Sequence, residues 1–107
     1  MAASGDCYRA NGRFVVSHMS DDKVKLCHGV GILQSDGKPF GHAWVLYGDR
    51  VIDKSNGQDI NFPKKLYYGL LKAPVKGTRI YEYTGEQVAK LMFQYKHWGP
   101  WDSKPPR

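Results

Sequence analysis

Three residues of this chain carry side chains that together can do nucleophilic chemistry: Cys7, His42 and Asp53. A thiolate attacks a carbonyl carbon, and an imidazole takes up the proton that the thiol gives away. A carboxylate that accepts the proton of one ring nitrogen fixes the tautomer and leaves the other nitrogen to act as a base. This chemistry requires the three side chains to meet, so the elements that carry them decide whether it is available.

The stretch from His42 to Ser55 predicts a β-hairpin that brings His42 and Asp53 together. Val, Ile, Trp and Tyr are abundant on both sides of a Gly-Asp pair, as in two strands joined by a tight turn. With Gly48 and Asp49 as the loop, the predicted cross-strand pairs are Tyr47–Arg50, Leu46–Val51, Val45–Ile52, Trp44–Asp53 and His42–Ser55. The side chains of His42 and Asp53 then share a face as diagonal neighbours, about 7–8 Å apart at Cα.

Cys7 is predicted to lie in the first turn of a helix over Asp6–Ser20. Apolar residues recur there at helical spacing; they are Cys7, Ala10, Phe14, Val15 and Met19. Ser4 or Asp6 is expected to be the N-cap. The unpaired N–H groups of a helix start stabilise a thiolate, and those of Cys7 and Tyr8 are expected to stabilise an oxyanion beside the sulfur.

The remaining pattern predicts an α+β fold. Expected strands are Val24–Leu33 and Arg79–Thr84, expected turns are Ser35–Pro39 and Pro74–Gly77, Ser55–Asp59 is a loop, and Leu66–Leu71 fits either a helix or a strand. A C-terminal helix begins with a capping box of Thr84 and Gln87, continues as an apolar stripe and stops at Gly99-Pro100. The helix that carries Cys7 is therefore expected to pack on a mostly antiparallel sheet, together with this second helix.

Four further residues are candidates for the walls of a substrate cleft: Tyr8, His28, Trp44 and Tyr68. Trp44 shares the predicted face of His42, and His28 is expected to line the cleft across from His42. Cys27 points to the face opposite His28, because neighbours in a strand alternate, and is expected to be a core residue. Packing in the core is an equally good interpretation of the aromatic candidates.

Length and composition are those of one domain over residues 1–107, with residues 1–5 and 102–107 expected to fray. The formal charge is +6, but the basic residues are spread along the chain and no nucleic-acid motif accompanies them. We interpret the charge as a solvated surface that can steer an acidic partner, and nucleic acid is not an expected partner. The oligomeric state stays open.

No apolar stretch reaches the ~18–20 residues that cross a membrane, so no membrane partner is expected. Residues 1–6 are too short and polar for a signal peptide, which favours a cytoplasmic location and reduced thiols. A zinc site formed by Cys7, Cys27, His28 and His42 lacks the short ligand spacings typical of such sites. No metal or organic cofactor is expected.

Three short motifs resemble the papain-like superfamily in its broad sense. They are Asp6-Cys7-Tyr8 at a helix start, Gly41-His42-Ala43-Trp44-Val45, and Val51-Ile52-Asp53. The resemblance is greatest to compact transglutaminase-like and bacterial NlpC/P60-type cysteine enzymes, and the size of the chain fits a small bacterial or phage protein. It implies a helix bearing the nucleophile packed on an antiparallel sheet, with Cys7 as nucleophile, His42 as base and Asp53 as the orienting residue. The family's Cys-Trp pair is Cys-Tyr here, and no glutamine before Cys7 matches the oxyanion residue of papain.

The resemblance and the residue pattern together predict a cysteine hydrolase, a peptidase or amidase that forms an acyl-enzyme on Cys7. The expected substrate is a peptide or protein. Two alternatives stay open: an acyl transferase or deamidase using the same residues, and a non-enzymatic protein-binding module or inhibitor, of the kind phages encode, on the same fold.

Overall fold

The computed structural model describes residues 3–32 and 37–102, except for the side chains of residues 3–6 and 56. The described chain forms α1 (Ala3–Ser17), β1 (Val24–Ile32), β2 (Pro39–Tyr47), β3 (Arg50–Asp53), the 3-10 turn η1 (Ser55–Gly57), β4 (Ile60–Pro63), α2 (Lys64–Leu71), β5 (Tyr81–Thr84) and α3 (Gly85–Tyr95). The strands form one antiparallel sheet in the order β4-β3-β2-β1-β5. The predicted α+β class is confirmed.

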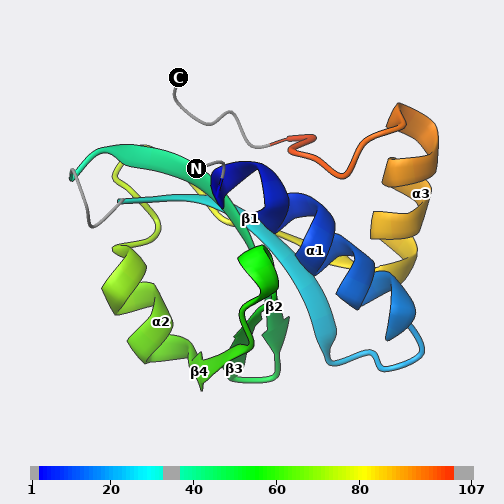
Figure 1. The fold of residues 1–107 in the computed structure, drawn as a ribbon, viewed down its shortest axis with the longest axis horizontal. Helices are drawn as coiled ribbons and strands as arrows, with labels where there is room; N and C mark the ends of the chain where they lie inside the picture. The colour runs from blue at the N-terminus through cyan, green and yellow to red at the C-terminus, as the bar shows by residue number, and fades with distance from the viewer. Residues whose placement is uncertain (1–2, 33–36, 103–107) are drawn as a thin grey trace.

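The helices cover both faces of the sheet (Figure 1). One core lies beneath α1 and α3, and Ala43 and Val45 of β2 point into it. The other core lies beneath α2 and receives Trp44 and Leu46 of the same strand. β2 is therefore apolar at successive positions because both of its faces are covered.

The hairpin of β2 and β3 has the predicted register. Val45 pairs with Ile52, Leu46 with Val51 and Tyr47 with Arg50. Gly48 in the turn has φ +64°, a conformation that favours glycine.

The ends of α1 differ from the prediction. The helix begins at Ala3 and ends at Ser17, rather than running from Asp6 to Ser20. Cys7 consequently lies one turn inside the helix, and neither Ser4 nor Asp6 is its N-cap. Residue types that favour a cap are also tolerated in the first turn, so the first of them along the chain need not mark the helix start.

Four further features of the chain bear on the predicted elements. Leu66–Leu71 belongs to helix α2, which resolves the ambiguity, and the unpredicted strand β4 pairs with β3 at the edge of the sheet. The capping box at Thr84 and Gln87 is present as predicted, but α3 ends at Tyr95, with Lys96 in the left-handed conformation, rather than at Gly99-Pro100. Of the predicted turn at Ser35–Pro39, residues 35 and 36 lie outside the described residues, and Pro39 begins β2.

Candidate active site

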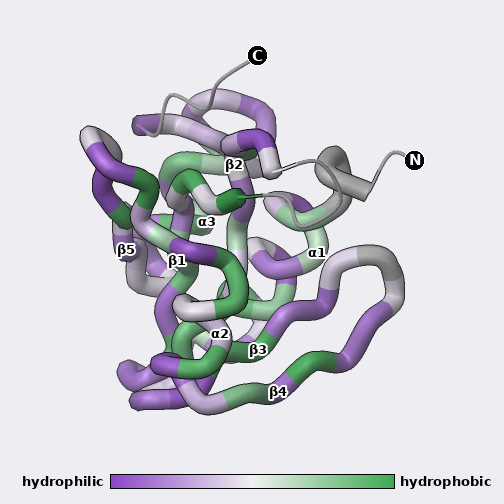
Figure 2. The backbone as a smooth tube through the Cα atoms, turned by 90° about the vertical axis from the view of Figure 1, so that its left-hand side faces the viewer, coloured by the Kyte–Doolittle hydropathy of each residue, from purple (hydrophilic) through white to green (hydrophobic). Residues whose placement is uncertain are grey.

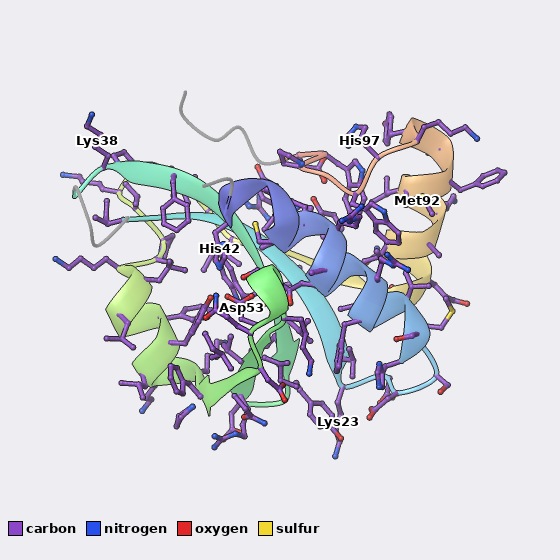
Figure 3. All side chains as sticks on the ribbon, in the orientation of Figure 1. Lys23, Lys38, His42, Asp53, Met92 and His97 are labelled. Atoms are coloured by element: carbon purple, nitrogen blue, oxygen red, sulfur yellow. The ribbon has the colours of Figure 1, made fainter. Side chains whose placement is uncertain are left out.

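The predicted contact between His42 and Asp53 is present. Nε2 of His42 lies 3.2 Å from Oδ2 of Asp53, and both residues are buried. The two side chains lie between α2 and α1 (Figure 3). The two residues belong to neighbouring strands in the predicted register, so their side chains lie on the same face of the hairpin and contact each other.

Asn11 of α1 fills the place where β2 and β3 separate. Its Nδ2 donates to the Ala43 carbonyl and to Oδ1 of Asp53, both at 3.0 Å, and its Oδ1 accepts from the Lys54 N–H at 2.8 Å. The side-chain amide thus bonds to a backbone group on each side of the hairpin, just past the last backbone pair between β2 and β3, which is Val45 with Ile52. Asn11 is completely buried, so these bonds replace contacts that water cannot supply.

Both carboxylate oxygens of Asp53 accept hydrogen bonds. Oδ1 accepts hydrogen bonds from the backbone N–H and the hydroxyl of Ser55, at 3.0 and 2.7 Å, in addition to the bond from Asn11. Burial alone would raise the pKa of Asp53, but the hydrogen bond and charge of His42 and the bonds from Asn11 and Ser55 outweigh it and hold the pKa well below its usual range. Asp53 is therefore ionised at neutral pH.

Tyr67 of α2 contacts both His42 and Asp53. Its hydroxyl donates to Oδ2 of Asp53 at 2.8 Å, so that its oxygen can accept from Nε2–H of His42 at 2.9 Å. Both acceptors favour the tautomer with the proton on Nε2. Nδ1 is then the nitrogen that carries the lone pair in the neutral ring.

Cys7 reaches this group from α1. Cys7 and Asn11 are four residues apart in the helix and therefore lie on the same side of it, one turn from each other. Nδ1 of His42 is buried and has no nitrogen or oxygen hydrogen-bond partner in the described part of the chain. Burial opposes a charged ring, but hydrogen bonds to Asp53 and to Cys7, with the charges of both, raise the pKa of His42 to about 9.

The site is more enclosed than the sequence suggested. Cys7 is completely buried, and the side chain of His42 keeps 11% of its area exposed. Two surface cavities of about 420 and 440 Å³ lie elsewhere, the first beside Arg79 and Tyr81 and the second beside Met19 and Glu86. Of the Cys7 and His42 side chains, only that of His42 is therefore partly exposed to solvent.

The oxyanion donors expected from the helix start are also placed differently. Because α1 begins at Ala3, the N–H groups of Cys7 and Tyr8 lie inside the regular helix, where N–H groups bond to carbonyls of the preceding turn. The Tyr8 hydroxyl is buried without a hydrogen-bond partner among the described residues. Burial and then the charge of Cys7 raise the pKa of the Tyr8 hydroxyl.

His28 does not face His42. Gly29, not His28, pairs with His42, so the two rings are on opposite faces of the sheet. The His28 ring is enclosed by the rings of Tyr8, Tyr83 and Trp101, with centroid distances of 4.9, 5.0 and 5.1 Å. Burial outweighs the nearby Asp102 and lowers the pKa of His28 to about 4, so this ring is neutral at physiological pH.

Trp44 lies on the same face of the sheet as His42, in the core beneath α2. Tyr68, a residue of α2, packs against this core. The Trp44 ring is 5.8 Å from that of His42 and completely buried, and its Nε1 donates to the Tyr68 hydroxyl at 3.2 Å. Cys27 is buried in the same core, as expected, and burial raises the pKa of its thiol to about 12. Trp44 therefore packs beside the His42 ring, and Tyr68 and Cys27 belong to the same core as Trp44.

Asn11 was not predicted as a site residue, and the sequence did not assign Tyr67 its contacts with His42 and Asp53. The position of Asn11 on the Cys7 side of the predicted helix was a usable signal, because a buried amide on an apolar helix face requires partners. The sequence indicated that Tyr67 could cover the site or bind substrate, with packing at least as good an interpretation, and it gave Tyr67 no partner, since its segment fitted either a helix or a strand.

Within the described residues, no group of three or more His, Cys, Asp or Glu side chains is arranged to hold a metal ion. None of the helices in that part of the chain is long and apolar enough to cross a membrane. Comparisons with protein-family models, curated proteins and solved structures found no match.

Proposed function

We propose that this protein is a cysteine hydrolase, a peptidase or amidase that forms an acyl-enzyme on Cys7. The observation that carries the proposal is the chain of contacts from Cys7 through His42 to Asp53, which the raised pKa of His42 reflects. A papain-like arrangement, with the nucleophile on a helix and the base and acid on the sheet, accounts for this geometry.

The side chains have separate roles in the proposed reaction. His42 holds the proton that the Cys7 thiol gives up, and the sulfur attacks the carbonyl carbon of an amide. The imidazolium then delivers this proton to the leaving amine, which departs as the carbon–nitrogen bond breaks and a thioester remains on Cys7. Water, deprotonated by His42, hydrolyses the thioester and restores the thiol.

Three residues position the reacting groups in this scheme. Asp53 and Tyr67 accept from Nε2–H of His42 and so keep Nδ1 for the sulfur. Asn11 joins the helix of Cys7 to the strands of His42 and Asp53. We assign stabilisation of the oxyanion to the Tyr8 hydroxyl, which follows Cys7 in α1 and has no hydrogen-bond partner among the described residues.

Complete burial of Cys7 favours a second candidate, the non-enzymatic binding module. The two functions differ in one observable: an enzyme accumulates an acyl group on Cys7 and then loses it. A binding module that retains the fold does neither.

The test is incubation with a library of peptide thioesters and activated esters, followed by intact-mass measurement. The expected result is a mass increase equal to the acyl group on Cys7, which decays as free acid appears. Cys7→Ser is expected to abolish the adduct, whereas Cys27→Ser, the matched control at the other buried thiol, retains it. A protein that forms no adduct, or one only on Cys27, is not a cysteine hydrolase of this kind.

A further inference from the structure

Most of the net positive charge of the chain lies in one stretch. Between Ile60 and Tyr81 the sequence has five basic residues and no acidic residue, whereas the whole chain has a net charge of +6. The basic residues of this stretch are Lys64, Lys65, Lys72, Lys76 and Arg79, and all except the half-buried Lys64 are exposed. The charge is thus less evenly distributed than the sequence analysis assumed.

The outer side of α2 within this stretch is also apolar. Leu66 and Leu70 are one turn apart, hence on the same side of the helix, and are 48% and 45% exposed. Figure 2 looks onto this helix, with hydrophobic and hydrophilic segments adjoining along it. An exposed surface that mixes leucine and lysine side chains is complementary to a chain that mixes acidic and apolar ones.

The inner side of the same helix belongs to the candidate active site. The Tyr67 hydroxyl is 2.9 Å from Nε2 of His42, so α2 has its inner side at the site and its outer side on the basic surface. A helix with side chains is about 10–12 Å across. An extended peptide covers about 3.3 Å per residue, so three or four residues beyond a reacting carbonyl are enough to reach the outer side of α2.

We propose that the surface formed by α2 and the basic segment that follows it binds an acidic stretch of the substrate, so that the enzyme prefers peptides with acidic and apolar residues beside the reacting carbonyl. This rests on the proposed function, because it assigns the substrate class of that same site. Attraction between the lysines and the acidic residues raises the rate of productive encounter and fixes the direction in which the peptide lies.

The test uses two iodoacetylated peptides that deliver the same reactive group to Cys7. One contains leucine and glutamate residues, the other the same leucines with lysines in place of the glutamates. At low ionic strength the glutamate reagent is expected to modify Cys7 about 10-fold faster. In 0.5 M salt the two rates are expected to converge, since screening shortens the range of the attraction.

Paired variants of equal charge locate the effect. The double variant Lys65→Glu and Lys76→Glu is expected to reduce the preference several-fold, whereas Lys23→Glu with Lys90→Glu, on exposed positions outside the basic stretch, keeps it. Leu66→Ser with Leu70→Ser is expected to slow the glutamate reagent several-fold without reversing the preference. Equal rates for the two peptides, or equal losses in both lysine pairs, would overturn the inference.

Plain iodoacetamide separates this inference from the proposed function. If iodoacetamide modifies Cys7 no faster than Cys27, the reactive site itself is wrong. If iodoacetamide prefers Cys7 but the two peptides do not differ, only the acidic-substrate surface is wrong.

Discussion

Replacing His42 with alanine is expected to slow alkylation of Cys7 by iodoacetamide at pH 7 by about 100-fold, the scale of general-base assistance. The thiolate is the reacting species, and the imidazolium of His42 is the group that stabilises it in the folded protein. The measurement is peptide mapping by mass spectrometry after timed exposure to the reagent, with the rate followed separately at each cysteine.

Cys27 is the internal reference for this experiment, because burial raises the pKa of its thiol to about 12. Its slow rate is expected to be the same in the variant. His42→Gln is a second variant that fills more of the space of the ring, so that a change in access to Cys7 is separated from the loss of the base. Wild-type rates at Cys7 in both variants would contradict the role of His42.

Replacing Asp53 with asparagine is expected to destabilise the fold by about 3 kcal/mol, because a buried group would lose charge-assisted hydrogen bonds. An amide has one acceptor oxygen, so its NH₂ group would face either the donors of Asn11 and Ser55 or those of Tyr67 and His42. Urea unfolding at pH 7 measures the loss.

The effect has a defined pH dependence. Since the pKa of Asp53 is lowered on folding, its stabilisation is present above the ordinary carboxyl pKa of about 4 and is lost as the pH falls below it. The advantage of wild type over Asp53→Asn should therefore shrink in acid. Asp59→Asn is the control, because Asp59 forms an exposed pair with Lys54 and is expected to change stability by less than about 1 kcal/mol. Equal small effects at both positions would show that Asp53 is not the centre of this network.

The sequence contained enough information to predict the half of the site that lies on the hairpin. The Gly-Asp turn and the strand pattern determine the register, and the register determines that His42 and Asp53 meet. Thr84 and Gln87 similarly mark the start of α3, because the capping box depends only on local geometry. At these positions, residues close together in the sequence determine the structure, so the sequence was sufficient to predict it.

The other half depends on contacts between distant segments. Asn11 bonds to Ala43 and Lys54, which are more than thirty residues away in the sequence. The hydrophobic periodicity of a helix or strand does not predict contacts between segments so far apart. Tyr67 lies at the site because α2 packs against the sheet, and Cys7 is buried because it belongs to the core between α1 and the sheet. Tertiary packing decides each of these features, so propensity and spacing could not predict them.

The coupling between Cys7 and His42 is central to the proposed site, and titration of the His42 ring by ¹⁵N NMR tests that coupling most directly. In the wild-type protein we expect a ring that is charged at pH 7 and loses its proton with a pKa of about 9. In Cys7→Ala the midpoint should fall, because the hydrogen bond and charge of the sulfur are gone. A midpoint near the ordinary value of about 6.5 that does not change in Cys7→Ala would contradict the account.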